Sequence, residues 1–172
     1  ISNTQGTAAV GSMVVFERGV PSKSLYRKFN IKTVVGPDDF ASMEEVLIRR
    51  FKRWQVAQEM AGERKPGYKA DLAFGLLPDL LIVDGGKGQL SAAAAELDAI
   101  QLEGPMLAAV AKGPARRPGK EVIHKRGERY ELRLDQDSAA LHLIQQVRDE
   151  AHRFAITGHR QRRGKARQSS PL

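Results

Sequence analysis

One apolar run that ends in an acid and a glycine turn constrains the fold of this chain more than any other segment. Residues 79–83 (DLLIV) are continuously apolar after the first position, a pattern typical of a strand buried on both faces of a sheet. Residues 84–88 (DGGKG) end this strand, and the Ala-rich residues 89–100 predict a helix. A strand, a tight turn and a helix in this order predict an α/β fold, with Asp84 at the carboxyl end of a strand.

The other patterns add strands and helices around this unit. The expected elements of the first half are strands at 8–16 and 24–33 joined by a turn at 17–19, a helix that follows the breakers at 36–39 and runs to about Met60, and a surface loop at 62–75. Those of the second half are a buried strand at 105–111, a hairpin of 121–124 with 129–134, and a final helix from Ala139 to about Thr157 behind an N-cap at Asp137-Ser138. They predict a single α/β domain over residues 1–163, a mixed β-sheet flanked by helices. Residues 164–172 are expected to be a basic, disordered tail.

The chain is basic, with 28 Lys and Arg against 20 Asp and Glu and a formal net charge of +8. This excess favours a polyanionic partner, although a generically soluble basic protein has the same balance. The cations gather in two clusters: Arg160, Arg162, Arg163, Lys165 and Arg167, and Arg116, Arg117, Lys120, Lys125 and Arg126. One Trp and three Tyr are few for stacking on bases, so contacts with phosphates are expected instead.

The chain contains no cysteine, which excludes disulfides, thiolate metal sites and cysteine nucleophiles. This composition suits a reducing cytoplasm, where we expect the protein to act. No apolar run is long enough to cross a bilayer, and residues 1–10 lack the pattern of a secretion signal. We therefore expect neither a membrane nor an export pathway to be involved.

Asp84 and its turn form the strongest candidate for a chemical site. Glycines at 85 and 86 allow a phosphate backbone to approach, and Lys87 lies near the start of the next helix, where anions bind. A carboxylate beside a lysine suits a divalent cation that holds a phosphate. The spacing is not that of a nucleotide-binding P-loop. An alternative role for Asp84 is to cap the following helix.

The final helix, and the start of the helix that ends near Met60, supply further candidates. Apolar residues at 140, 143, 144, 147, 151 and 155 form a stripe at helical spacing, with Arg148 and His152 beside it. His152 either reaches a site at the strand ends or bonds to a backbone carbonyl. Capping explains one acid of the pair Asp38 and Asp39, and Glu44 and Glu45 suit the opening turns of that helix. The other acid of the pair is available as a ligand.

Taken together, these motifs resemble the UvrC family of bacterial excision-repair nucleases. The matching stretches are 1–6 (ISNTQG), 10–16 (VGSMVVF), 36–40 (GPDDF), 83–90 (VDGGKGQL), 137–142 (DSAALH) and 148–156 (RDEAHRFAI), followed by His159-Arg160. They run through nearly the whole chain in collinear order. The resemblance implies an RNase H-like endonuclease domain, from the C-terminal part of the family, that cuts damaged double-stranded DNA on the 5′ side of a lesion.

The resemblance also implies a metal site for Mg²⁺ or Mn²⁺. In the family this site consists of two strand-borne aspartates and a histidine on the last helix. Asp84 matches the second aspartate, His152 matches the histidine, and Asp39 matches a further important acid. The first aspartate of the family precedes the residue matched by Ile1, so we expect the chain as given to bind metal weakly and to cut little or not at all. We also expect the family's other nuclease, its UvrB-docking segment and its helix-hairpin-helix tail to lie outside this chain.

The hypothesis of phosphodiester hydrolysis assigns roles to several cations. Lys87 and Arg148 steady the scissile phosphate, and Arg49, Arg50, Arg160 and Arg163 position the duplex without contacting bases. The partners expected are damaged duplex DNA and UvrB, with the domain itself a monomer. Two alternatives remain open: a non-catalytic duplex-binding module of a repair assembly, and a related RNase H-like nuclease such as endonuclease V.

Overall fold

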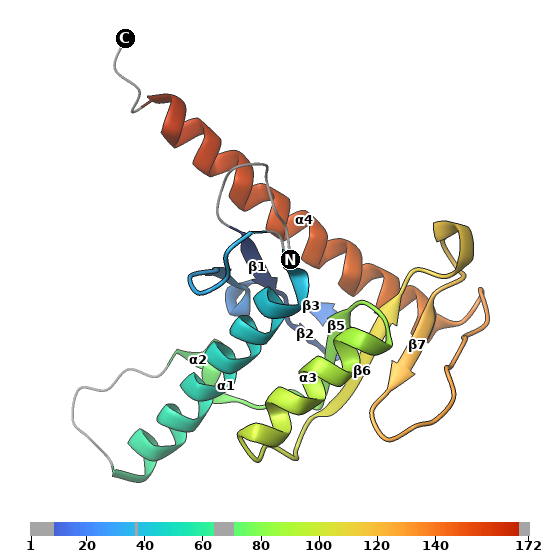
Figure 1. Cartoon of the computed structure of the whole chain (residues 1–172), viewed down its shortest axis with the longest axis horizontal. Coiled ribbons are helices and arrows are strands. Elements are labelled where there is room, and N and C mark those ends of the chain that lie inside the picture. The colour runs from blue at the N-terminus through green and yellow to red at the C-terminus, as the bar shows by residue number, and fades with distance from the viewer. Residues whose placement is uncertain (1–8, 37, 64–70, 169–172) are drawn as a thin grey trace. The chain divides into compact units, whose positions relative to one another are not determined.

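The computed structural model is a mixed α/β fold (Figure 1), as the sequence predicts. It describes residues 9–36, 38–63 and 71–168, and the side chains of Glu63, Leu72 and 158–168 are outside this description. The chain divides into two compact units, Ile1–Val46 with Gln145–Leu172, and Leu47–Ile144. Each unit is described by itself.

The first unit contains the expected antiparallel hairpin. Strand β1 (Val10–Met13) pairs with β4 (Arg27–Asn30), and Val10 lies opposite Asn30. These strands are shorter than the expected 8–16 and 24–33, because β2 (Phe16–Glu17) and β3 (Val20–Pro21) form a second small hairpin between them. Arg18 and Gly19 join β2 to β3 with φ values of 53° and 78°, the left-handed conformation that type I′ turns require. A 3₁₀ turn, η1 (Lys23–Leu25), leads back into β4.

Helix α1 (Asp39–Glu63) begins in the first unit and continues into the second. The carboxylate of Asp38 accepts a hydrogen bond of 3.0 Å from the Ala41 N–H and so caps the helix. Met43, Leu47 and Phe51 are buried at a spacing of four residues, which places them on one face. The helix extends to Glu63, three residues beyond the Met60 that the sequence indicates.

The second unit contains a three-stranded mixed sheet in the order β5-β6-β7. Strand β5 (Leu80–Asp84) is parallel to β6 (Met106–Ala111), which is antiparallel to β7 (Val122–Lys125). A bridge between Ile123 and Leu132 supplies the other side of the expected hairpin. The prediction that β5 is buried on both faces is wrong, since Leu80 is 46% exposed and only Val83 is buried. The prediction holds for β6, the central strand of the three.

The second unit also contains helices α3 (Lys87–Ala99) and α2 (Leu72–Gly75). Helix α3 buries Ala93 and Leu97 and contacts all three strands. The stretch 62–75, expected to be a loop, holds the end of α1 and the short helix α2, and the Asp71 carboxylate caps α2 by accepting from the Ala73 N–H. Breaker residues predicted an irregular segment here, but an aspartate cap was enough for one helical turn. The part of that loop at 64–70 lies outside the described residues.

The last element is helix α4 (Ala139–Gln168). The Ser138 carbonyl accepts its first hydrogen bond, from the His142 N–H at 3.1 Å. The helix continues past Thr157 and through residues 164–168 of the expected tail, while 169–172 lie outside the described residues. Among the α4 residues whose side chains are described, 139–157, those buried are Leu141, Arg148 and Ala155. None of the described helices has the length and apolarity needed to span a membrane.

The stripe predicted for α4 is correct in part: Ala155 is buried and Ile144 packs against buried core residues, but the most buried face is rotated relative to the prediction. Leu143 is 37% exposed and Ala140 is also exposed, whereas Leu141 and the charged Arg148 are buried. The buried residues are seven apart, two helical turns, so the period was correct. The prediction took the apolar residues as the buried face, but the aliphatic stem of an arginine packs like an apolar side chain.

Candidate functional site

Asp84 is the last residue of β5, and its side chain is exposed at the carboxyl end of the sheet. The backbone fixes this position: the Gly85 N–H donates to the Val110 carbonyl of β6 at 2.9 Å. Gly85 has a φ of +149°, and a Cβ there would lie 2.5 Å from the Gln89 side chain. The turn therefore requires glycine directly after the carboxylate.

Helix α3 begins directly after the glycine turn that follows Asp84. Gly86 is the N-cap residue, and its N–H donates to Gln89 Oε1 at 3.0 Å. This is the half of a capping box in which the side chain in the first turn reaches back to the backbone. The N-cap position of α3 is therefore occupied by Gly86 and not by Asp84. Lys87 is the first residue of α3 and is exposed, so a cation and a carboxylate occur at the same end of the sheet.

His152 belongs to α4 in the first unit, and its side chain is exposed. The residue before it is tied to the β1–β4 hairpin, because Ser12 Oγ donates to the Ala151 carbonyl at 2.8 Å. Phe154, two residues after it, contacts the Tyr26 ring edge-on at 5.2 Å between centroids, and Lys28 Nζ lies 4.5 Å from its centroid. The helical turn that carries His152 is thus held against the hairpin on both sides.

A charged network completes this attachment. The Tyr26 hydroxyl donates to Glu150 Oε1 at 3.2 Å, and Arg153 donates to both Glu150 oxygens at 2.6 and 2.9 Å. Burial raises the pKa of Tyr26 to about 12, and the bond to Glu150 adds to this shift. The bond from Arg153 lowers the pKa of Glu150, and Glu150 in turn raises the pKa of Arg153. At neutral pH the network therefore consists of a neutral phenol between helix and strand and a fixed ion pair.

Sequence reasoning did not single out Tyr26 or Glu150. A clue was available, since Tyr26 directly precedes the strand that contains the buried Phe29, and a buried phenol needs a polar partner. The partner lies 124 positions away along the chain, too far for any local pattern to indicate it.

Asp39 and Glu45 have different environments on α1. Asp39 is the first helical residue and is exposed, and the cap of the helix is provided by Asp38, so the role predicted for Asp39 as a ligand stays a prediction. Glu45 is 7% exposed and accepts hydrogen bonds from the Lys32 N–H at 3.0 Å, the Thr33 N–H at 2.7 Å and the Thr33 hydroxyl. Glu45 therefore joins α1 to the segment after β4, a contact that the sequence does not indicate.

Arg50 has an internal role. Its guanidinium donates to the Leu76 carbonyl at 2.7 Å and the Phe74 carbonyl at 3.4 Å, and it lies about 5 Å from the Phe51 and Phe74 rings. Burial lowers the pKa of Arg50, and the nearby Asp71 acts in the opposite direction. Because its donors face the protein's own carbonyls, we assign Arg50 a structural role in place of the expected contact with DNA.

The other expected DNA contacts differ in accessibility. Arg148 is 8% exposed, and Arg49 is half-buried. Arg160 and Arg163 are in the part of α4 whose side chains are not described. Within the described residues, no three His, Asp or Glu side chains lie close enough to enclose a cation by themselves. Asp84 and His152 belong to different units, so their meeting at one cation stays a prediction.

Comparison with known proteins defines the class to which this α/β domain belongs. Residues 1–156 match the family model described as the UvrC RNase H endonuclease domain, so one family domain extends over both compact units. The chain therefore belongs to the UvrC RNase H endonuclease domain family, and the RNase H-like fold class is confirmed.

Relatives with the name UvrABC system protein C match along the whole chain. Identity is 48% over 172 residues with the protein of Pseudomonas paraeruginosa, 49% over 172 residues with that of Pseudomonas savastanoi pv. phaseolicola, and 46% over 173 residues with that of Alkalilimnicola ehrlichii. The chain spans 26% of the length of each of these relatives.

Proposed function

We propose that this domain is a metal-dependent DNA endonuclease that hydrolyses a phosphodiester bond on the 5′ side of a lesion, within the UvrABC excision system. The observation that carries the proposal is the placement of Asp84. It is an exposed carboxylate at the end of a sheet strand, next to a turn that only glycine can form and to the exposed Lys87. Membership of an endonuclease domain family supports the same reaction.

The residues present fit a divalent cation in part. Asp84 offers the hard oxygen ligand that Mg²⁺ and Mn²⁺ prefer, and His152 offers an exposed imidazole on a firmly attached helical turn. When bound, such a cation supplies an activated water and neutralises charge on the leaving oxygen. The remaining ligand in this proposal is the family's aspartate preceding the position of Ile1.

The chain's own residues then bind and orient the strand. Lys87 faces the scissile phosphate and offsets its charge as negative charge develops. His152 either binds the cation or carries a proton from the attacking water, which an imidazole can do near neutral pH. Asp39 is a second carboxylate for the site. Arg148 is buried, so a direct phosphate contact is no longer part of its role.

The partners follow from the same proposal. Damaged duplex DNA is the substrate, and UvrB is a partner that contacts a region outside this chain. The cytoplasm, where bacterial DNA lies, is the expected location, and a monomeric domain is the expected state.

Cleavage by an Asp84→Asn variant tests the proposal. We expect a chain extended by an aspartate before Ile1 to cut a damaged duplex in Mn²⁺, and Asp84→Asn to reduce the rate by roughly 100-fold or more. Asp79→Asn is the matched control, because Asp79 is exposed just before the opposite end of β5, and its effect should stay within about twofold. Equal rates for the Asp84→Asn variant and the parent would contradict the proposal.

The second candidate is a non-catalytic duplex-binding module. The exposed cations of the second unit favour it, because phosphate binding needs no metal site. It predicts duplex binding that is sensitive to salt and unaffected by Asp84→Asn, with no cleavage by the extended chain in any divalent metal.

A further inference from the structure

The loop at 112–120 (KGPARRPGK) carries four cations and no acid, and the proposed function gives it no role. Lys112, Arg116, Arg117 and Lys120 are all exposed. In the described part of the chain, none of them forms an ion pair with a carboxylate. The basic cluster of the sequence also includes Lys125 and Arg126, which both lie near carboxylates. Arg126 pairs with Asp98, and Lys125 Nζ lies 3.9 Å from Glu128. The positive charge of this cluster is therefore concentrated in the 112–120 loop.

The backbone of the 112–120 loop is closed by its own hydrogen bonds. The Arg116 N–H donates to the Gly113 carbonyl at 3.0 Å, and the Lys120 N–H donates to the Arg117 carbonyl at 3.3 Å. The two ends of the loop lie against each other at Gly113 and Lys120. A Cβ on Gly113 would lie 1.6 Å from the Lys120 carbonyl oxygen, so only glycine allows the two backbones to approach this closely. The loop thus presents Arg116 and Arg117 from two consecutive turns.

Two residues in this loop have an unfavourable conformation. Ala115 and Arg116 have φ values of 58° and 52°, in the left-handed region that side chains other than glycine rarely adopt. Strain of this kind persists where the surrounding structure imposes it, and it is concentrated at sites of function. A loop already held in one shape also loses less conformational entropy when a ligand binds.

The sheet places the 112–120 loop at the same end as Asp84. Strands β5 and β6 are parallel, and Asp84 is in register with Val110. Strand β6 ends one residue later, at Ala111, and Lys112 follows directly. Both the Asp84 turn and the loop therefore leave the carboxyl ends of adjacent parallel strands, where ligands of α/β sheets gather.

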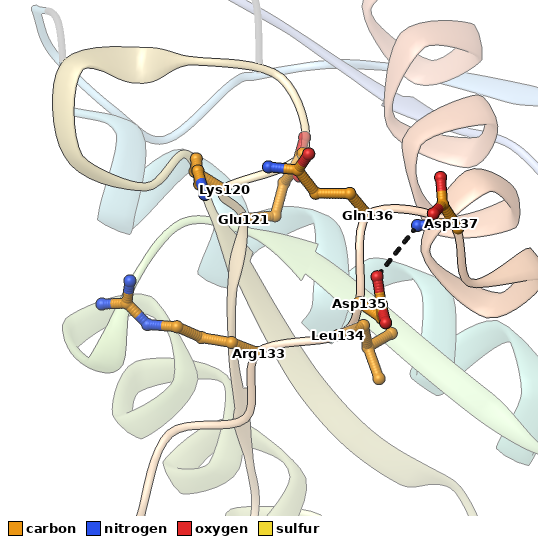
Figure 2. Close-up of a pocket in the computed structure, with 8 residues that line it drawn as sticks. Lys120, Glu121, Arg133, Leu134, Asp135, Gln136 and Asp137 are labelled. Carbon is orange, nitrogen blue, oxygen red and sulfur yellow. Dashed lines mark hydrogen bonds between the residues drawn. The ribbon is translucent and has the colours of Figure 1, made fainter.

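A polar pocket beside the loop is less suited to a polyanion. Its volume is about 480 Å³, and it lies between the end of the loop and the segment that precedes α4 (Figure 2). Its charged lining includes Lys120 and Arg133 but also Glu121, Asp135 and Asp137. The acids offset the cations there, whereas the outer part of the loop has no acid.

We propose that the 112–120 loop binds the phosphodiester backbone of the DNA strand that passes Asp84, with Arg116 and Arg117 as its main contacts. Guanidinium groups bind phosphate oxygens in pairs, and the loop has no aromatic residue for stacking on bases. The contact is therefore with the backbone and is independent of base sequence. Only the passage of the strand beside Asp84 rests on the proposed function.

Duplex binding by the double variant Arg116→Gln/Arg117→Gln tests this assignment. Binding of a fluorescein-labelled duplex is followed by anisotropy across a range of KCl concentrations, without divalent metal. Loss of two phosphate contacts should reduce the slope of log K against log salt by about 1.8 and weaken binding by roughly 10- to 100-fold at about 0.1 M salt. Lys125→Gln/Arg126→Gln is the matched control, because it removes the same charge from the same unit at positions paired with carboxylates. We expect a change of less than about threefold for it.

The outcomes separate this inference from the proposed function. Equal weakening in both double variants would overturn the assignment, since general charge would then account for binding. An unchanged salt slope in Arg116→Gln/Arg117→Gln would also overturn it. Loop-dependent binding combined with no cleavage by the extended chain would contradict the nuclease proposal and leave the loop's role intact. Circular dichroism spectra and melting curves show whether each variant is folded.

Discussion

At the scale of single residues, charged side chains inside the protein differ most from what the sequence indicates. Arg50 and Glu45 are both nearly buried, and both bind backbone groups of the unit that contains them. A sequence shows the charge of such residues but not which carbonyl or N–H group lies opposite them. Asp84 and Lys87 were easier to predict, because a strand end followed by glycines and a helix start defines their position locally.

The internal role of Arg50 leads to a prediction about stability. Arg50→Ala removes two hydrogen bonds to carbonyls and the contacts with two rings, so we expect the free energy of unfolding to fall by about 2–4 kcal/mol. Arg49→Ala, one position away and less buried, should cost less than about 1 kcal/mol. Urea unfolding followed by circular dichroism measures both. Weaker duplex binding with unchanged stability in Arg50→Ala would restore the DNA-contact role instead.

At the scale of elements, much of the secondary structure was predictable and the burial of each element was not. The β1–β4 hairpin, α1, α3 and α4 follow from periodicity, turn residues and caps that lie within a few positions of one another. The burial of β5 and β6 depends on which strand is central, and apolar runs of similar length do not distinguish the two. The phase of α4 was predicted only in part for a related reason, since Arg148 takes a buried position that hydropathy assigns to leucine or alanine.

The attachment of α4 to the hairpin gives a prediction with a defined pH dependence. Tyr26→Phe removes the hydrogen bond to Glu150 and should lower the free energy of unfolding by about 1 kcal/mol at pH 7. The pKa of Tyr26 is raised to about 12 in the folded protein, from about 10 in the unfolded chain. Between these values the unfolded state releases the proton first, so stability contributed by the neutral phenol is complete below pH 10 and is lost as pH rises toward 12.

The measurement compares the stability of the parent and Tyr26→Phe from pH 8 to pH 11.5. The difference should shrink above pH 10 and then change sign, because Tyr26→Phe has no phenol to ionise at this position. Lysine and the other tyrosines titrate in both proteins, so their contributions cancel in the difference. A difference that is constant over this range would show that Tyr26 is not held in its neutral form.

At the scale of the whole molecule, the family match treats as one domain the two units that the structure describes separately. One family domain covers both units, yet Asp84 lies in the second and His152 in the first. A site that combines residues from both depends on contacts between positions distant in sequence, and these have no local signature. The proposed reaction follows only from the family resemblance, because charge, strand ends and caps suit many proteins that bind phosphates. With the chain at 26% of its relatives' length, lesion choice and UvrB contact are properties to test in longer proteins.

The central claim is that Asp84 and His152 bind the same cation. Titration of Mn²⁺ into the chain extended by an aspartate, followed by electron paramagnetic resonance of the free ion, tests this claim directly. We expect Asp84→Asn and His152→Ala each to weaken Mn²⁺ binding by roughly tenfold or more, and the double variant to be little worse than Asp84→Asn alone, because ligands of one cation act as a unit. Asp79→Asn should bind as the parent does. Mn²⁺ binding by Asp84→Asn with the affinity of the parent would contradict the account.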